Sequence, residues 1–114
     1  MERDSAFLKH ILEAVETIES YIRNMKRTDF LAEPNKIVRD AVVREFEIIG
    51  EATRRLSEEI KKKYQDLPWQ DISDMRNKLI HEYFGVDMAV VWKTIETDLP
   101  KLKKIVGQIL NSKE

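Results

Sequence analysis

Cysteine is absent from this chain of 114 residues, which excludes disulfide bonds and thiol catalysis and disfavours the usual zinc sites. Glycine and proline number only three each, too few for the many tight turns of a β-sandwich or barrel. No apolar run approaches the roughly 20 residues that a membrane span needs. The charged first residues run directly into an amphipathic pattern, with no secretory signal. We therefore expect a cytoplasmic protein with no membrane partner.

A strong excess of one charge is also missing, because the formal net charge is −1. This excludes a global basic field that would attract nucleic acid, so any RNA-binding charge has to be local. Charged residues make up 36% of the chain and hydrophobic residues 42%, which is typical of a soluble helical protein. The length and the absence of repeats predict a single helical domain over residues 1–114.

Apolar residues repeat at spacings of three and four along most of the chain, as they do in amphipathic helices. We expect a first helix over about residues 5–26, capped by Asp4 or Ser5, and a second over about residues 35–64. His10 lies beside the first apolar stripe with no evident second ligand or carboxylate partner. We interpret it as a surface or boundary histidine.

A last long helix is expected to start near Asp87, and its apolar stripe keeps its phase through Pro100. We therefore predict one helix that is kinked at Pro100 rather than two separate helices. A short helix over residues 72–85 precedes it. Four or five helices with short connections predict an all-α fold, an antiparallel four- to five-helix bundle.

The short helix carries the densest set of reactive side chains, Arg76, Asn77, His81 and Tyr83. Asp71 or Ser73 is expected to cap its start and Gly85 its end. At about 100° per residue, Arg76 and Tyr83 fall within about 20° of each other, and Asn77 and His81 are one turn apart. Arg76 and His81 are about 140° apart. They meet at one phosphate only if the helix deforms, the arginine side chain wraps round, or a second subunit completes the site.

These side chains suit RNA cleavage without a metal or cofactor, in which the 2′-OH attacks the adjacent phosphorus. His81 can act as base or acid near neutral pH, and Arg76 offers donors that match phosphate oxygens. Asn77 can orient His81 or a phosphate oxygen, while Tyr83 can donate to phosphate or stack on a base. One histidine in the motif supplies one acid–base group, so a dimer that joins two motifs would supply two.

Structural interpretations of the same residues stay open. An arginine followed five positions later by a histidine often arises by chance, Arg76 can be an ion-pair residue, and Tyr83 can be core. Glu51 either lies on the solvated surface or pairs with Arg76 and orients it. The lysines at residues 61–63 suit a helix C-terminus, and they can also form an RNA-binding patch.

The stretch PWQDISDMRNKLIHEYFGVDMAVVW resembles the minimal HEPN-domain toxins of the HepT type. Their R-x4-H-x-Y signature is matched by Arg76, His81 and Tyr83, and Asn77 fills the polar position after the arginine. Upstream, FEIIGEATRRLSEE resembles the second long helix of that family. The resemblance covers about residues 28–105 and implies an all-helical, HEPN-like domain.

The resemblance also implies a homodimer whose two motifs face each other across a cleft. It implies the toxin of a type VII toxin–antitoxin system, an endoribonuclease in which Arg76 and His81 are catalytic and Asn77 assists. The implied partner is a minimal nucleotidyltransferase antitoxin that can transfer AMP onto Tyr83. A bulky anion in a phosphate-binding cleft would repel and block RNA.

Two other functions are compatible with the sequence. The first is a non-catalytic helical module that only partners the nucleotidyltransferase, as its substrate-binding half. The second is a structural bundle with a coincidental motif. The near-neutral charge does not indicate which RNA would be the target.

Overall fold

A computed structural model of the chain describes residues 2–81 and 87–112; for residue 2 and residues 76–81 it describes the backbone but not the side chain. Within this part the chain forms helices and no strand, which confirms the all-α prediction. The elements are α1 (Glu2–Tyr21), α2 (Arg27–Leu31), the 3-10 helix η1 (Glu33–Asn35), α3 (Lys36–Arg54), α4 (Glu58–Lys63), α5 (Trp69–His81), α6 (Met88–Thr97) and α7 (Leu99–Ser112).

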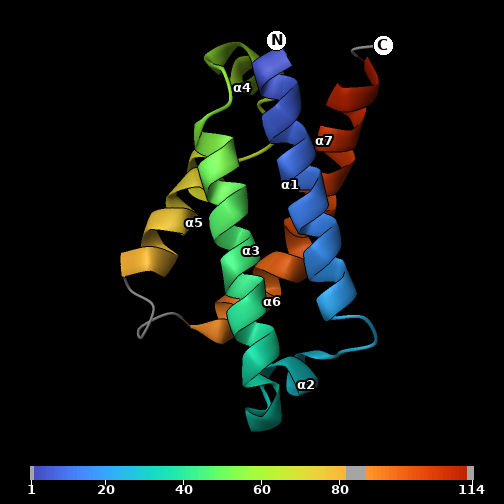
Figure 1. The fold of residues 1–114 in the computed structure, drawn as a ribbon, viewed down its shortest axis with the longest axis vertical. Coiled ribbons are helices and arrows are strands. Elements are labelled where there is room, and N and C mark those ends of the chain that lie inside the picture. The colour runs from blue at the N-terminus through green and yellow to red at the C-terminus, as the bar shows by residue number, and fades with distance from the viewer. Residues whose placement is uncertain (1, 82–86, 113–114) are drawn as a thin grey trace.

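Four of these helices, α1, α3, α5 and α7, run in alternating directions along the bundle (Figure 1). Helix α3 is central and packs against both α1 and α5, while α1 also packs against α7. Helix α6 crosses behind α3, while α4 lies at the end of the bundle where α1 begins and α7 finishes, opposite α2 and the start of α3 (Figure 1). The helix that carries the candidate site, α5, is therefore supported mainly by α3.

The core is formed by the apolar stripes that the spacing predicts. Burial of these side chains is the main favourable contribution to the stability of the bundle. The rings of Phe30 and Trp92 lie with their centroids 5.1 Å apart and join α2 to α6. Among the side chains that the structure describes, the fully buried aliphatic ones include Leu8, Ile11, Val15 and Ile18 from α1, Val42 and Ile49 from α3, and Val106 and Ile109 from α7.

The predicted cap of the first helix is wrong. Helix α1 begins at Glu2, so Asp4 and Ser5 lie inside it. The Asp4 carboxylate is buried and accepts hydrogen bonds from the backbone N–H and the hydroxyl of Ser57, at 2.9 and 2.8 Å. Its partner is 53 positions away in the sequence, so local spacing could not reveal it.

The second expected helix is two helices, because α3 ends at Arg54 and α4 begins at Glu58. Ser57 takes an extended conformation between them, and its hydroxyl accepts a hydrogen bond from the N–H of Ile60 at 3.3 Å. This N-cap competes with a continuous helix. The apolar stripe nevertheless continues, since Leu56 and Ile60 are both buried.

The single helix expected through Pro100 is also two helices, which separate at Asp98. Proline is tolerated in the first turn of a helix, where its missing N–H has no helical partner to lose, and Pro100 is the second residue of α7. Helix α6 lies across the bundle and α7 runs along it (Figure 1). Ile95 and Leu99 are buried on either side of the break, so the predicted phase of the stripe is right.

Candidate functional site

Helix α5 carries the candidate site and begins at Trp69, directly after Pro68. Asp71 therefore lies in the first turn and Ser73 lies inside the helix, so neither caps it as expected. The Trp69 ring is buried, and its Nε1 donates a hydrogen bond of 2.8 Å to the Tyr64 carbonyl. This contact fixes the start of the helix. The predicted end at Gly85 lies outside the described residues.

The apolar face of α5 is directed toward the core. Ile72 and Met75 are half-buried and pack against it, and Ser73 is buried between them in the sequence. On the exposed side, Gln70 donates to Asp74 at 2.8 Å, one turn away. This packing fixes the rotation of the helix against α3 up to the point where the motif begins.

The backbone of α5 is helical from Trp69 through His81, so Arg76, Asn77 and His81 all belong to one helix. A regular helix keeps Arg76 and His81 about 140° apart and Asn77 one turn before His81. The helical backbone therefore does not support the alternative in which the helix deforms before His81 so that Arg76 and His81 meet. The side chains of all three lie outside the described part of the chain, and so does Tyr83.

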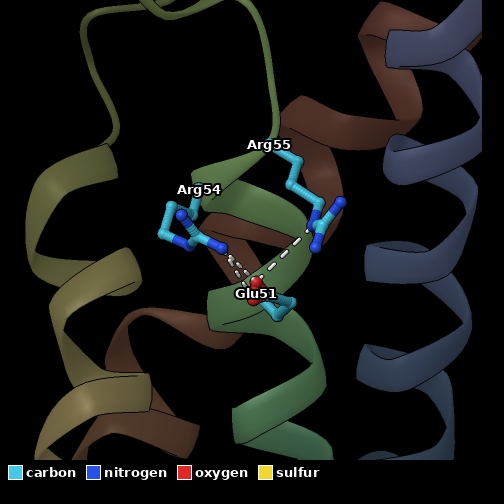
Figure 2. Close-up of polar contacts among 3 residues, drawn as sticks. All are labelled: Glu51, Arg54 and Arg55. Carbon is cyan, nitrogen blue, oxygen red and sulfur yellow. Dashed lines mark hydrogen bonds and ion pairs between the residues drawn. The ribbon is translucent and has the colours of Figure 1, made fainter.

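Glu51 lies on α3 and binds two arginines of its own helix (Figure 2). Its carboxylate accepts hydrogen bonds of 2.7 and 3.2 Å from Nη2 of Arg54, and Nε of Arg55 lies 3.5 Å away. The spacings of three and four between Glu51 and these arginines are typical of such pairs, so the sequence itself carries this signal. The pairing of Glu51 with Arg76 stays a prediction.

Glu51 also lines a groove of about 430 Å³ between α1 and α3, together with Phe7, His10, Arg44, Glu47, Ile48, Ala52 and Arg55. Arg44 contacts Glu47 at 3.5 Å, so each arginine of the groove lies close to a glutamate. The exposed His10 packs edge-on against the Phe7 ring at 6.2 Å, which confirms it as a surface histidine. The groove is thus close to neutral.

Two ionisable groups near these elements have shifted pKa values. Burial raises the pKa of Glu45 on α3, and neighbouring Arg44 partly opposes this. The pKa of Lys103 on α7 is raised by a hydrogen bond of 2.8 Å to Glu19 on α1.

Among the residues that the structure describes, no three His, Cys, Asp or Glu side chains group as metal ligands would. In the same part of the chain, no helix has the length and apolar character that crossing a membrane requires.

Comparison with known proteins gives a consistent family. The family model described as Ribonuclease HepT-like matches residues 11–109. A protein of Caldanaerobacter subterraneus subsp. tengcongensis named "Putative RNase" is 39% identical over the full length of both chains. The "Probable ribonuclease HepT" of Thermococcus cleftensis is 44% identical over 85% of this chain and 86% of its own.

A third relative is longer than this chain. It is the "Gamma-glutamylcyclotransferase and putative RNase" of Methanocaldococcus jannaschii, which is 42% identical over 91% of this chain. The match covers only 46% of that relative, so the chain spans about half of its length. No solved structure gives a significant match.

Proposed function

The chain belongs to the HepT-like ribonuclease family, and on this premise we propose that it is the toxin of a type VII toxin–antitoxin system. Its activity would be that of a metal-independent endoribonuclease. The observation that carries the proposal is that Arg76, Asn77 and His81 lie on one helix, α5, inside the matched region. Helix α5 packs on α3, which gives the motif a rigid support.

In the proposed reaction, the 2′ oxygen forms a bond to the adjacent phosphorus while the bond from phosphorus to the 5′ oxygen breaks. A base takes the proton of the 2′-OH, and an acid delivers a proton to the leaving 5′ oxygen. The products are a 2′,3′-cyclic phosphate and a 5′-hydroxyl. Arg76 stabilises the charge that develops on the phosphate oxygens, and Asn77 orients His81 or a phosphate oxygen.

His81 supplies one of the two proton transfers. We infer that a second copy of the chain supplies the other, in a homodimer that places two α5 helices across a shared cleft. The separation of about 140° between Arg76 and His81 on a regular helix supports such a composite site. Glu51, on the helix against which α5 packs, is proposed to orient Arg76.

The proposed partner is a minimal nucleotidyltransferase antitoxin that silences the toxin by modifying Tyr83. The phenol oxygen of Tyr83 would attack the α-phosphorus of ATP, forming a bond to AMP and releasing pyrophosphate. The added negative charge would repel RNA phosphates. Intact mass of the toxin co-expressed with its genomic neighbour tests this step, because AMP units mapped to Tyr83 are expected.

Cleavage of RNA in EDTA by the purified protein tests the activity, with mass spectrometry of the 3′ ends. His81→Ala and Arg76→Ala should each reduce cleavage by at least about a hundredfold, as loss of an acid–base group or a charge-stabilising donor does. His10→Ala is the matched control, because His10 is the other of the two histidines and is exposed. Unchanged cleavage by His81→Ala would contradict its assignment.

A further inference from the structure

Lysines lie at the end of α4 and on the face of α7 that borders the same hollow. The last turn of α4 is Lys61-Lys62-Lys63. A hollow of about 400 Å³ adjoins it, lined by Lys62, Lys63, Tyr64, Gln65 and Asp66 and, from α7, by Ile105 and Gln108. The two helices therefore lie side by side at this hollow, although they are about 40 positions apart in the sequence.

Helix α7 adds two more lysines on the same face. Lys101 is one turn before Ile105 and Lys104 is one turn before Gln108, so all four share one side of the helix. Ile105 and Gln108 line the hollow, and both lysines are exposed. The five residues Lys61, Lys62, Lys63, Lys101 and Lys104 are called the lysine patch below.

Acidic residues flank the lysine patch on its own helices, since Glu58 and Glu59 lie one turn before Lys62 and Lys63, and Asp98 lies three residues before Lys101. Within the part of the chain that the structure describes, none of its five lysines forms an ion pair, whereas Lys36 and Lys103 bind carboxylates at 2.8 Å. Asp66 is the one acidic residue among those that line the hollow. Because the whole chain carries a formal net charge of −1, the rest of the chain is net negative. The patch is thus a local basic site on an otherwise acidic molecule.

The other groups at the hollow are of kinds that contact single-stranded nucleic acid. Tyr64 offers an aromatic ring, with Lys63 Nζ 5.7 Å from its centroid, and Gln65 and Gln108 are exposed hydrogen-bonding amides. Bases stack on such rings while lysines contact the backbone. Ile105 is the one aliphatic residue that lines the hollow, whereas the buried centre of a protein interface is more apolar. An RNA strand fits this surface better than a protein does.

We propose that the lysine patch binds the phosphates of single-stranded RNA and guides the strand toward α5. This step rests on the proposed function insofar as the bound RNA is the substrate. The Tyr64 carbonyl that borders the patch accepts the hydrogen bond of Trp69, the first residue of α5. Arg76 lies seven residues further, about 10 Å along the helix axis. The patch therefore adjoins the start of the helix that carries the motif.

Fluorescence anisotropy with a labelled single-stranded 2′-O-methyl RNA tests the proposal. This probe has no free 2′-OH, so binding is measured independently of cleavage. The double variant Lys63→Gln/Lys104→Gln removes one lysine from each helix of the patch. The matched control, Lys9→Gln/Lys93→Gln, removes the same charge from exposed positions on α1 and α6. Equal melting temperatures of both variants would show that folding is unaffected.

The patch variant should bind about tenfold more weakly than wild type, with a salt dependence shallower by about 1.4 in the log–log slope, since two phosphate contacts are lost. The control should bind like wild type. Equal affinities of all three proteins, or an equal loss in both variants, would overturn the proposal. The proposal would also be overturned if the patch variant bound RNA as well as wild type does but bound anionic vesicles or an acidic protein more weakly.

Cleavage of unmodified RNA separates this proposal from the proposed function. If the wild type binds through the patch but cuts no RNA, the patch is supported and the ribonuclease mechanism on α5 fails. If the wild type cuts RNA through His81 and the patch variant binds and cuts equally well, the mechanism is supported and the patch fails.

Discussion

The carboxylate of Asp4 accepts two hydrogen bonds from Ser57, one from the backbone N–H at 2.9 Å and one from the hydroxyl at 2.8 Å. Asp4 lies in the first turns of α1, and Ser57 is the N-cap of α4. One buried side chain thus connects the start of the chain to the turn between α3 and α4. The same turn follows Arg54 and Arg55, which hold Glu51 (Figure 2).

Replacement of Asp4 by alanine should lower the free energy of unfolding by about 1–3 kcal/mol, because the partly buried N–H and hydroxyl of Ser57 lose an acceptor. Urea unfolding at neutral pH measures the change. The exposed Asp66→Ala is the control and should stay within about 0.5 kcal/mol of wild type. If Asp4→Ala and Ser57→Ala have fully additive effects, the two side chains are not coupled as described.

Arg39 fastens α2 to α3 through its guanidinium. Its Nη1 donates to the carbonyls of Phe30 and Ala32 at 2.8 and 2.6 Å, and the side chain is half-buried. Arg39→Ala should destabilise the protein by about 2 kcal/mol, since hydrogen bonds from a charged donor are lost. Thermal unfolding tests this, with the exposed Arg23→Ala as control. Equal melting temperatures for the two variants would argue against the role of Arg39.

The two tryptophans allow a matched test of one hydrogen bond. Trp69 and Trp92 are 6% and 5% exposed, but only the Nε1 of Trp69 has a partner within the described residues. Replacement of Trp69 by phenylalanine should therefore cost about 1 kcal/mol more than Trp92→Phe. Denaturant unfolding of both variants provides the comparison. A smaller loss for Trp69→Phe would contradict the importance of its bond to Tyr64.

The raised pKa of Glu45 predicts a pH-dependent effect on stability. Its carboxyl group binds a proton more readily in the folded state, so its penalty is absent well below the ordinary glutamate pKa. The penalty grows as the pH rises through that value toward the raised one. Glu45→Gln should thus increase the melting temperature slightly at neutral pH, and the gain should shrink in acid. The exposed Glu96→Gln should show no such trend.

Glu51 provides a test of how Arg76 is oriented. If Glu51 positions Arg76, Glu51→Gln should reduce RNA cleavage about tenfold, equivalent to about 1.4 kcal/mol of transition-state stabilisation. The double variant Arg54→Gln/Arg55→Gln removes the known partners of Glu51 but leaves its carboxylate. It should cleave at least as well as wild type. Equal losses in both variants would instead indicate a purely structural role for the cluster.

The helical fold and its core followed from apolar spacing, because burial of a stripe is a local property of an amphipathic helix. Leu8, Ile11 and Val15, which follow this spacing within the first expected helix, are all fully buried. The breaks between helices could not be predicted from this spacing. At Ser57 a side-chain N-cap ends one helix and starts the next, although the apolar stripe continues in phase. The hydroxyl of Ser57 donates to Asp4, which comes from a distant part of the chain.

The candidate site was predicted from sequence only as a set of residues on one helix. The structure places Arg76 and His81 on α5 and Glu51 on the adjacent α3. Whether two copies complete the site depends on contacts between chains, which one sequence does not encode in its spacing. The face of α7 that carries Lys101 and Lys104 shows the same limit, because it reaches the hollow beside α4 only after the chain turns at Asp98.

The return of α7 to α1 after that turn leads to an expectation about the order in which the helices associate. Helices α1 and α3 are near neighbours in the sequence, whereas α7 returns to α1 and joins Lys103 to Glu19, which are 84 positions apart. Closing so long a loop is entropically costly, so we expect the helices from α1 to α5 to associate first and α7 to dock late. Destabilising substitutions in α7 should then mainly accelerate unfolding, while those between α1 and α3 should slow refolding.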